Sequence, residues 1–337
     1  MTGGPDTPGR RRAPRLAGLG LACLAGAGAL AWAAAALFID LRAAPPLRAL
    51  AAAAYLGASL WALAAFKARG KGLWGVLAGF CLVLGWWLAL KPSDYRPWQP
   101  DAARTPWAEV SGDTVTVHNV RNCDYRAEFD YTPRWETRSY GLSKIRGVDV
   151  MFTYWSNPRI AHVVVSFPFE GGKYLDFSIE TRKEEGEEYS NFLGFFRQYE
   201  LLYVAADERD VVRLRTNYRK GEETYLYRTT ATPEYARELF LKYVRRMNRA
   251  HGRPQWFSTL TNNCTTNVAA MAGEPRLDWR VIFSGLADRM LYDQGKLETG
   301  GLSFDALKAQ AHINDAARAA DKAPDFSARI RAGRAGF

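Results

Sequence analysis

Three long apolar runs near the N-terminus set the strongest limit on what this chain can fold into. They cover residues 16–39, 49–66 and 72–90, and each is near the roughly 20 residues that a membrane-spanning helix needs. A cleaved signal peptide is the alternative for the first run, but that run is long for such a peptide and two more follow it. The sequence therefore predicts three transmembrane helices within residues 1–91.

The placement of Lys and Arg predicts how these helices are oriented. Basic side chains lie before the first run and between the second and third, with fewer in the remaining loop: Arg10, Arg11, Arg12, Arg15, Lys67, Arg69 and Lys71 against Arg42 and Arg48. Basic loops favour the cytoplasmic side, so we expect a cytoplasmic N-terminus and an extracytoplasmic segment at 92–337. Residues 1–91 account for +8 of the net charge of +10, which leaves too small an excess elsewhere to favour nucleic-acid binding.

The rest of the chain indicates a linker, a mixed α+β domain and a tail. Residues 92–104 are polar and contain prolines, which is typical of a linker. Residues 105–312 alternate as strands do before helical patterns follow, and the clearest hairpin turns at Gly171-Gly172. We expect residues 313–337, rich in Ala, Arg and Asp, to be a poorly ordered tail.

In the stretch 256–267, a polar run that contains a single cysteine, Cys264, follows the aromatic pair Trp256-Phe257. Asn262 and Asn263 are good N-cap residues, so a short helix is expected to begin here with Cys264 in its first turn. Unpaired backbone N–H groups and the helix dipole favour a thiolate there, and a nucleophile with a lowered pKa is the functional interpretation. The alternatives are a small buried residue that begins a helix, or a disulfide with Cys123.

A cysteine nucleophile needs a base, and the chain has only four histidines. His251 lies at a predicted helix end and His312 near the tail. His118 lies at a strand end beside a polar loop. His162 enters an apolar strand and is held more rigidly, so we favour His162 as the base and keep His118 as the alternative.

The return strand of the hairpin offers a third group to orient the imidazole of His162. A two-residue loop would put Thr181 opposite His162, whereas a three-residue loop would put Glu180 there. Ser178 is one diagonal step from Glu180. Glu180 is the stronger orienter, and its alternative role is a surface ion pair with the basic residues that follow it.

Three segments of this chain resemble one known family. They are HVVVSFPFEGGKYLDFSIETRKEEGEEYS at 162–190, GFFRQYELLYVAADERDVVRLRTNYR at 194–219 and FSTLTNNCTTNV at 257–268. They resemble the extracytoplasmic N-terminal domain of bacterial lipoprotein N-acyltransferases that work by intramolecular transacylation. The resemblance covers about residues 105–312.

The resemblance implies a permuted papain-like, or NlpC/P60-like, thiol fold in which a strand histidine precedes a helix cysteine, as His162 precedes Cys264. It implies a thioester enzyme that moves an acyl chain from the glycerol moiety of a lipoprotein to its N-terminal amine. Backbone N–H groups around Asn263 and Thr265 are the oxyanion candidates. Neither a cofactor nor a metal is expected. The family carries its membrane helices after this domain, whereas here three precede it.

Together these points predict an inner-membrane protein with an extracytoplasmic Cys–His acyltransferase domain, whose partner is a membrane lipid or a lipoprotein. Two alternatives remain. One is a cell-wall peptide hydrolase with the same Cys–His core. The other is a membrane-anchored binding or structural module without enzymatic activity, in which Cys123 and Cys264 form a disulfide.

Overall fold

The computed structural model describes residues 12–65, 71–155, 157–273 and 284–337. The chain divides into two compact units, the first made of residues 1–91 with 196–198 and the second of residues 92–195 and 199–337. The predicted α+β class, with three apolar helices before a sheet domain, is confirmed.

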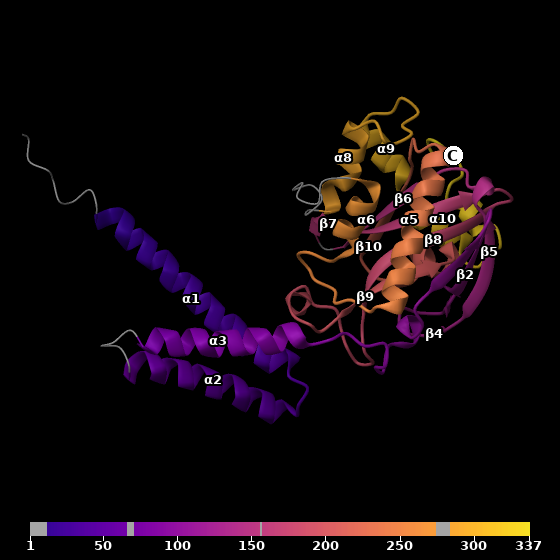
Figure 1. Cartoon of the computed structure of the whole chain (residues 1–337). Helices are drawn as coiled ribbons and strands as arrows, with labels where there is room; N and C mark the ends of the chain where they lie inside the picture. Colours follow the sequence, from indigo (N-terminus) through magenta and orange to yellow (C-terminus); the bar gives the residue numbers. More distant parts are fainter. Residues whose placement is uncertain (1–11, 66–70, 156, 274–283) are drawn as a thin grey trace, which may run out of the picture. The chain divides into compact units, whose positions relative to one another are not determined.

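The first unit consists of the helices α1 (Arg12–Asp40), α2 (Pro45–Ala65) and α3 (Lys71–Ala89), which are labelled in Figure 1. Each contains a segment long and apolar enough to cross a membrane, and the described part of each predicted apolar run lies on one of them, except that Leu90 follows the end of α3. Glycine permits close packing of α3 on α2, because a Cβ on Gly72 would lie 2.3 Å from the carbonyl oxygen of Ala62.

The second unit is built on an eight-stranded sheet in the order β1-β2-β9-β8-β7-β6-β10, with β5 also paired to β2. The strands are β1 (Trp107–Ser111), β2 (Thr114–Arg121), β5 (Trp135–Gly141), β6 (Asp149–Trp155), β7 (Asn157–Phe169), β8 (Lys173–Arg182), β9 (Glu200–Ala206) and β10 (Glu222–Arg228). A separate small hairpin consists of β3 (Asp124–Tyr125) and β4 (Tyr131–Thr132).

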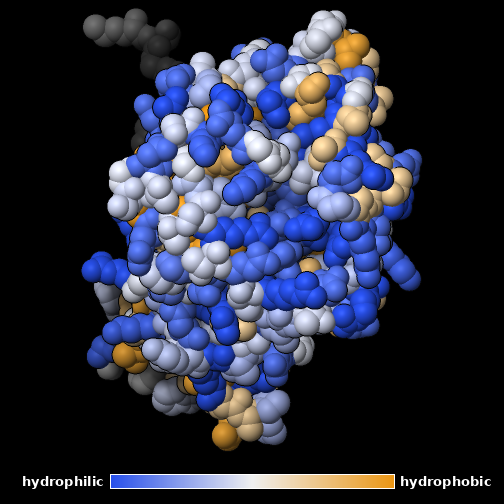
Figure 2. Space-filling view, turned by 90° about the vertical axis from the view of Figure 1, so that its right-hand side faces the viewer, coloured by the Kyte–Doolittle hydropathy of each residue, from blue (hydrophilic) through white to orange (hydrophobic). Residues whose placement is uncertain are grey.

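Helices cover both faces of this sheet, so its strands carry apolar side chains on both sides. The face with Val163 and Val165 packs against α5 (Pro233–Gly252) and α6 (Cys264–Ala272). The face with Val164 packs against α4 (Glu208–Arg213), α10 (Asn314–Ala320) and α11 (Phe326–Arg329). α9 (Phe304–Ala311) contacts β10, and α8 (Ala287–Asp293) precedes it. The molecular face in Figure 2 is mostly hydrophilic, with only small apolar areas.

The C-terminal residues 313–337 correct the prediction of a poorly ordered tail. They form α10 and α11, and Phe326 and Ile330 are completely buried against the sheet. Arg331 lies 2.9 Å from Asp149 and 2.6 Å from Glu208, both of which are buried. Composition misled the prediction, because two large apolar residues at helical spacing and one buried arginine anchor a stretch that is otherwise small and polar.

The predicted linker 92–104 also packs onto the second unit. Trp98 is buried, and the guanidinium of Arg182 lies 4.3 Å from its ring centroid. Arg182 also donates to Asp94 at 2.6 Å, and the backbone N–H of Ser93 donates to Glu200 at 2.6 Å. The chain is therefore hydrogen-bonded to the rest of the second unit from Ser93 onward, four residues after the end of α3.

Candidate functional site

Cys264 is the first residue of α6, as its sequence context predicts. The side chain of Asn263 accepts a hydrogen bond from the backbone N–H of Thr266 at 3.0 Å, and the hydroxyl of Thr266 accepts one from the backbone N–H of Asn263 at 3.0 Å. This reciprocal pair is a capping box, and it fixes where the helix begins. Cys264 is half-buried and packs at the edge of the core beside α5.

The capping geometry separates the two oxyanion candidates. Asn263 has its backbone N–H bound to Thr266, and its side-chain amide donates to the carbonyl of Thr259 at 2.7 Å. Thr265 is the better candidate, because its hydroxyl lies 3.6 Å from Sγ of Cys264 and its backbone also faces the sulfur. A helix start leaves such first-turn N–H groups without partners inside the helix.

The pKa of the Cys264 thiol is raised, which corrects the expectation of a lowered value. Burial raises it, and Thr265, Arg215 and the backbone of Val163 lower it only in part. Removal from water disfavours the thiolate, and the helix start does not offset that penalty. The resting side chain is therefore a protonated thiol.

His162 lies on β7, is buried, and belongs to a chain of three polar groups. Its Nε2 is 2.7 Å from Oγ of Ser178, and that hydroxyl donates to Oε1 of Glu180 at 2.8 Å. Because the hydroxyl proton goes to the carboxylate, Ser178 accepts from Nε2–H, and Nδ1 is the basic nitrogen of the ring.

The hairpin register produces this chain. Phe169 pairs with Lys173 and Val164 with Ser178, so the loop between the strands has three residues. The same register, continued two residues beyond the last pair, aligns Glu180 rather than Thr181 with His162. The sequence alone is compatible with both loop lengths, because Gly171 and Gly172 suit either one.

Glu180 is mostly buried and is held by two arginines from distant parts of the chain. Arg215 lies 3.2 Å from Oε1, and Arg121 lies 3.8 Å from Oε2. Burial alone would raise the pKa of Glu180, but Arg121 and Arg215 outweigh it and hold the pKa below its ordinary value. The alternative of a surface ion pair with the following basic residues is not what the structure shows. Arg215 lies on η5 (Leu214–Tyr218), a π-helical turn of a kind often found at functional sites.

The surroundings of His162 keep its imidazole neutral. Burial lowers its pKa well below the ordinary value and Arg215 lowers it further, while Glu180 opposes them. A neutral imidazole at neutral pH can accept a proton, which a general base must do.

Among the described residues, no hydrogen bond joins the thiol of Cys264 to the imidazole of His162. The side chains of His162 and Ser178 lie on the sheet face of Val164, whereas α6 packs on the face of Val163. The β7–β8 ladder begins only at Val164 and Ser178, so the preceding part of β7 pairs with β6 alone. The sulfur faces the backbone of Val163, next to His162 in the chain. The Cys–His pair therefore remains a prediction.

The other cysteine of this unit does not compete for the role. Cys123 and Cys264 are both free thiols, so the predicted alternative of a disulfide is absent from the described structure. Cys123 is fully buried, and burial together with Asp210 raises its pKa to about 12. Such a thiol is unreactive at neutral pH.

The remaining histidines have partners elsewhere. His118, the alternative base, stacks on Trp107 with ring centroids 4.0 Å apart. His251 lies 2.7 Å from the hydroxyl of Thr105, and His312 lies 2.5 Å from Glu223. None of these contacts involves Cys264.

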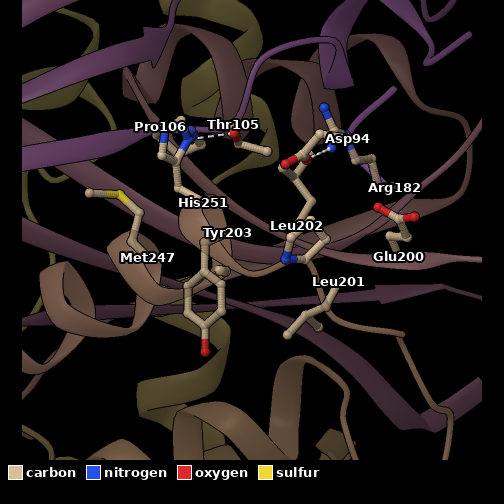
Figure 3. Close-up of a pocket in the computed structure, with 12 residues that line it drawn as sticks. Asp94, Thr105, Pro106, Arg182, Glu200, Leu201, Leu202, Tyr203, Met247 and His251 are labelled. Atoms are coloured by element: carbon tan, nitrogen blue, oxygen red, sulfur yellow. Dashed lines mark hydrogen bonds and ion pairs between the residues drawn. The ribbon is translucent and has the colours of Figure 1, made fainter. Parts of the chain in front are cut away.

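The second unit has two concave regions whose lining residues do not include Cys264. Figure 3 shows the smaller, where His251 faces Thr105 and Arg182 faces Asp94. Its volume of about 10 Å³ is no more than one water needs. The larger, of about 430 Å³, is lined by Arg138, Ser139, Tyr140, Gly172, Lys173, Tyr174, Asp207, Arg209, Pro324 and Ser327. Within the described part of the chain, no cluster of His, Cys, Asp and Glu could hold a metal ion.

Comparison with known families bears on the same residues. Residues 131–284 match the family model of the Lnb N-terminal periplasmic domain. The matched range includes His162, Ser178, Glu180, Arg215 and Cys264, and it confirms the resemblance drawn from the three sequence segments. No curated protein and no solved structure matches the chain. With its three apolar helices, the chain is a membrane-associated protein with a periplasmic segment.

Proposed function

We propose that the periplasmic unit is a cysteine-dependent acyltransferase that acts on a lipid-linked substrate such as a lipoprotein. The observation that supports it most is the position of Cys264, at a helix start beside the strand whose His162 is linked through Ser178 to an ionised Glu180. The order of strand histidine and helix cysteine also supports a permuted papain-like arrangement. The proposal includes a cytoplasmic N-terminus, with 92–337 outside the cytoplasm.

The first half-reaction forms a thioester. Nδ1 of His162 takes the thiol proton of Cys264 as the sulfur attacks an ester carbonyl carbon, and a C–S bond forms. The tetrahedral intermediate carries its negative charge on the former carbonyl oxygen, near the first-turn N–H groups of α6. The C–O bond to the alcohol then breaks, and the imidazolium gives its proton to the departing alkoxide. The products are an alcohol and an S-acyl cysteine.

The second half-reaction releases the acyl chain. An amine attacks the thioester carbonyl, and His162 takes a proton from the nitrogen. The C–S bond breaks, the imidazolium returns its proton to the thiolate, and an amide is formed.

The charges around the site suit a base that starts neutral. Protonation of His162 creates a cation whose Nε2–H donates to Ser178, and Ser178 donates to the ionised Glu180. Catalysis also requires Nδ1 to come within reach of Sγ. Because the two side chains lie on opposite faces of the sheet here, this needs a rearrangement at the start of β7, where that strand pairs with β6 alone.

Mass spectrometry of the full-length protein with a diacylglyceryl lipopeptide tests this proposal. We expect one added acyl chain on Cys264, followed by an N-acylated peptide. Cys264→Ala should abolish both, while Cys123→Ala, which removes the other free thiol of the same unit, should retain both. N-acylation by Cys264→Ala protein, or release of peptides from peptidoglycan fragments without acyl transfer, would contradict the proposal.

A further inference from the structure

Four exposed apolar side chains lie on two short segments of the second unit. Phe192 and Leu260 are 60% and 65% exposed, and Tyr189 and Phe195 are both 42% exposed. Exposed apolar residues are ordinary when scattered singly, whereas a contiguous group marks an interaction surface. We call these four residues the apolar patch.

Hydrogen bonds hold the two segments of the apolar patch together. The backbone N–H of Thr259 donates to the carbonyl of Gly194 at 2.9 Å, and its hydroxyl donates to the carbonyl of Asn191 at 3.0 Å. A Cβ on Gly194 would lie 2.2 Å from that hydroxyl, so glycine is what permits this approach. Phe192, Phe195 and Leu260 each adjoin one of these bonded residues in the chain, so the two segments that carry the patch lie side by side.

The apolar patch borders the candidate nucleophile. Leu260 lies in the turn that leads into α6, where the side chain of Asn263 donates to the carbonyl of Thr259. The ring of Tyr189 lies edge-on to that of Phe257 with ring centroids 6.4 Å apart, and burial first and Cys264 second raise the pKa of Tyr189 to about 12. A partner on the patch would therefore lie at the turn that leads into the Cys264 helix.

Only a short stretch of chain separates α3 from a point anchored on this edge of the domain. α3 ends at Ala89, and Ser93 is hydrogen-bonded to Glu200. The four intervening steps span at most about 14 Å at 3.6 Å per residue. Glu200 and Trp256 form an antiparallel β-bridge between their backbones. The backbone N–H of the next residue, Phe257, donates to the carbonyl of Tyr199 at 3.0 Å. Leu260 is three residues beyond Phe257.

We propose that the apolar patch inserts into the outer leaflet of the lipid bilayer, which sets Cys264 at the level of the lipid headgroups. Aromatic and leucine side chains are those that enter the interfacial layer of a membrane. The short connection from α3 to Ser93 places the interfacial layer of the membrane within reach of the patch. This favours a bilayer over a soluble protein as the partner. The proposal holds whether or not Cys264 is a nucleophile.

Photo-crosslinking of the full chain, carrying Cys264→Ala so that no acyl-enzyme forms, tests the insertion. The photoreactive residue benzoylphenylalanine replaces Phe192, Phe195 or Leu260 in separate proteins, each reconstituted in phosphatidylethanolamine–phosphatidylglycerol vesicles. The matched control is the same replacement at Phe129, which is 88% exposed in the loop between β3 and β4. The replacement at Leu82 of α3 reports that the vesicles contain the protein in a membrane-inserted form.

We expect on the order of tenfold more lipid adduct from the patch positions than from Phe129, because side chains of interfacial segments sit about 5–10 Å into the headgroup and acyl boundary. Equal adduct at Phe129 and at the patch, with adduct present at Leu82, would overturn the proposal. Adducts to a second copy of the chain in place of lipid would overturn it as well. Neither result depends on acyl transfer, so a failure here is distinct from a failure of the proposed function.

Discussion

Ser178→Ala is the sharpest test of the polar chain that links His162 to Glu180. Ser178 is completely buried, and its hydroxyl accepts from Nε2 of His162 and donates to Glu180. Alanine removes both bonds without changing charge. Nε2–H of the imidazole is then left without its acceptor, while Glu180 keeps Arg215.

The structure sets the size of the effect. A buried donor left without a partner costs about 1–3 kcal/mol. For a unit of this size, about 1 kcal/mol shifts the melting temperature by roughly 2–4 °C. A positioned general base contributes about 10²–10⁴-fold to rate, and we expect loss of its orientation to remove about tenfold or more of that.

Ser166→Ala supplies the matched control. Ser166 lies on β7, is completely buried, and donates to the carboxylate of Glu208 at 2.9 Å, much as Ser178 donates to Glu180. Both variants should lower the melting temperature measured in detergent, but only Ser178→Ala should slow formation of the acyl-enzyme on Cys264, followed by mass spectrometry. Equal rates for the two variants would refute the orienting role of Ser178.

Three further predictions concern the nucleophile, its ionisation and the topology. His162→Ala and Cys264→Ala should each abolish acyl transfer with the fold intact by circular dichroism, and the double variant should be no worse, because members of one unit lose their effect together. The midpoint of Cys264 alkylation against pH should lie above the free-thiol value of about 8.5. It should rise further in Arg215→Met, because this variant removes a cation that lowers the pKa of Cys264. A midpoint below the free-thiol value would contradict the argument that burial raises this pKa. Reporter fusions after Lys71 and after Lys91 should report opposite sides of the membrane, and two cytoplasmic signals would reverse the predicted orientation.

The low pKa of His162 gives the pH dependence a definite sign. Its folded value lies below its ordinary value of about 6.5, so the unfolded chain binds the extra proton first as pH falls. This contribution to stability is complete above about pH 6.5 and is lost as pH falls toward the folded value. The same shift keeps the base unprotonated, so acyl transfer should continue below pH 6.5.

Features that depend on local sequence could be predicted. The three apolar helices follow from run length and composition, and the first-turn position of Cys264 follows from its asparagine N-cap. The strand position of His162 follows from the apolar residues after it. Each of these depends on neighbours within one turn or one strand.

Features that depend on distant residues could not be predicted. Arg121 and Arg215 come from β2 and η5, and nothing near Glu180 in the sequence indicates that they hold its carboxylate. The predicted direction of the pKa shift of Cys264 is wrong for the same reason, because burial of the thiol against the core is a tertiary effect. The C-terminal helices were missed because Phe326 and Ile330 find their partners on the sheet.

Arg215 connects these long-range effects. Its charge lowers the pKa of both Cys264 and His162, so it favours a thiolate but disfavours an imidazolium. For transfer of one proton from sulfur to imidazole these two effects oppose each other, and Arg215 changes that equilibrium less than either shift suggests. Its larger contribution is to hold Glu180 ionised at 3.2 Å, since that carboxylate stabilises the imidazolium through Ser178. A protonated Cys264 thiol and a neutral His162 imidazole are then the resting state, and in the proposed mechanism charge separation accompanies attack on the carbonyl.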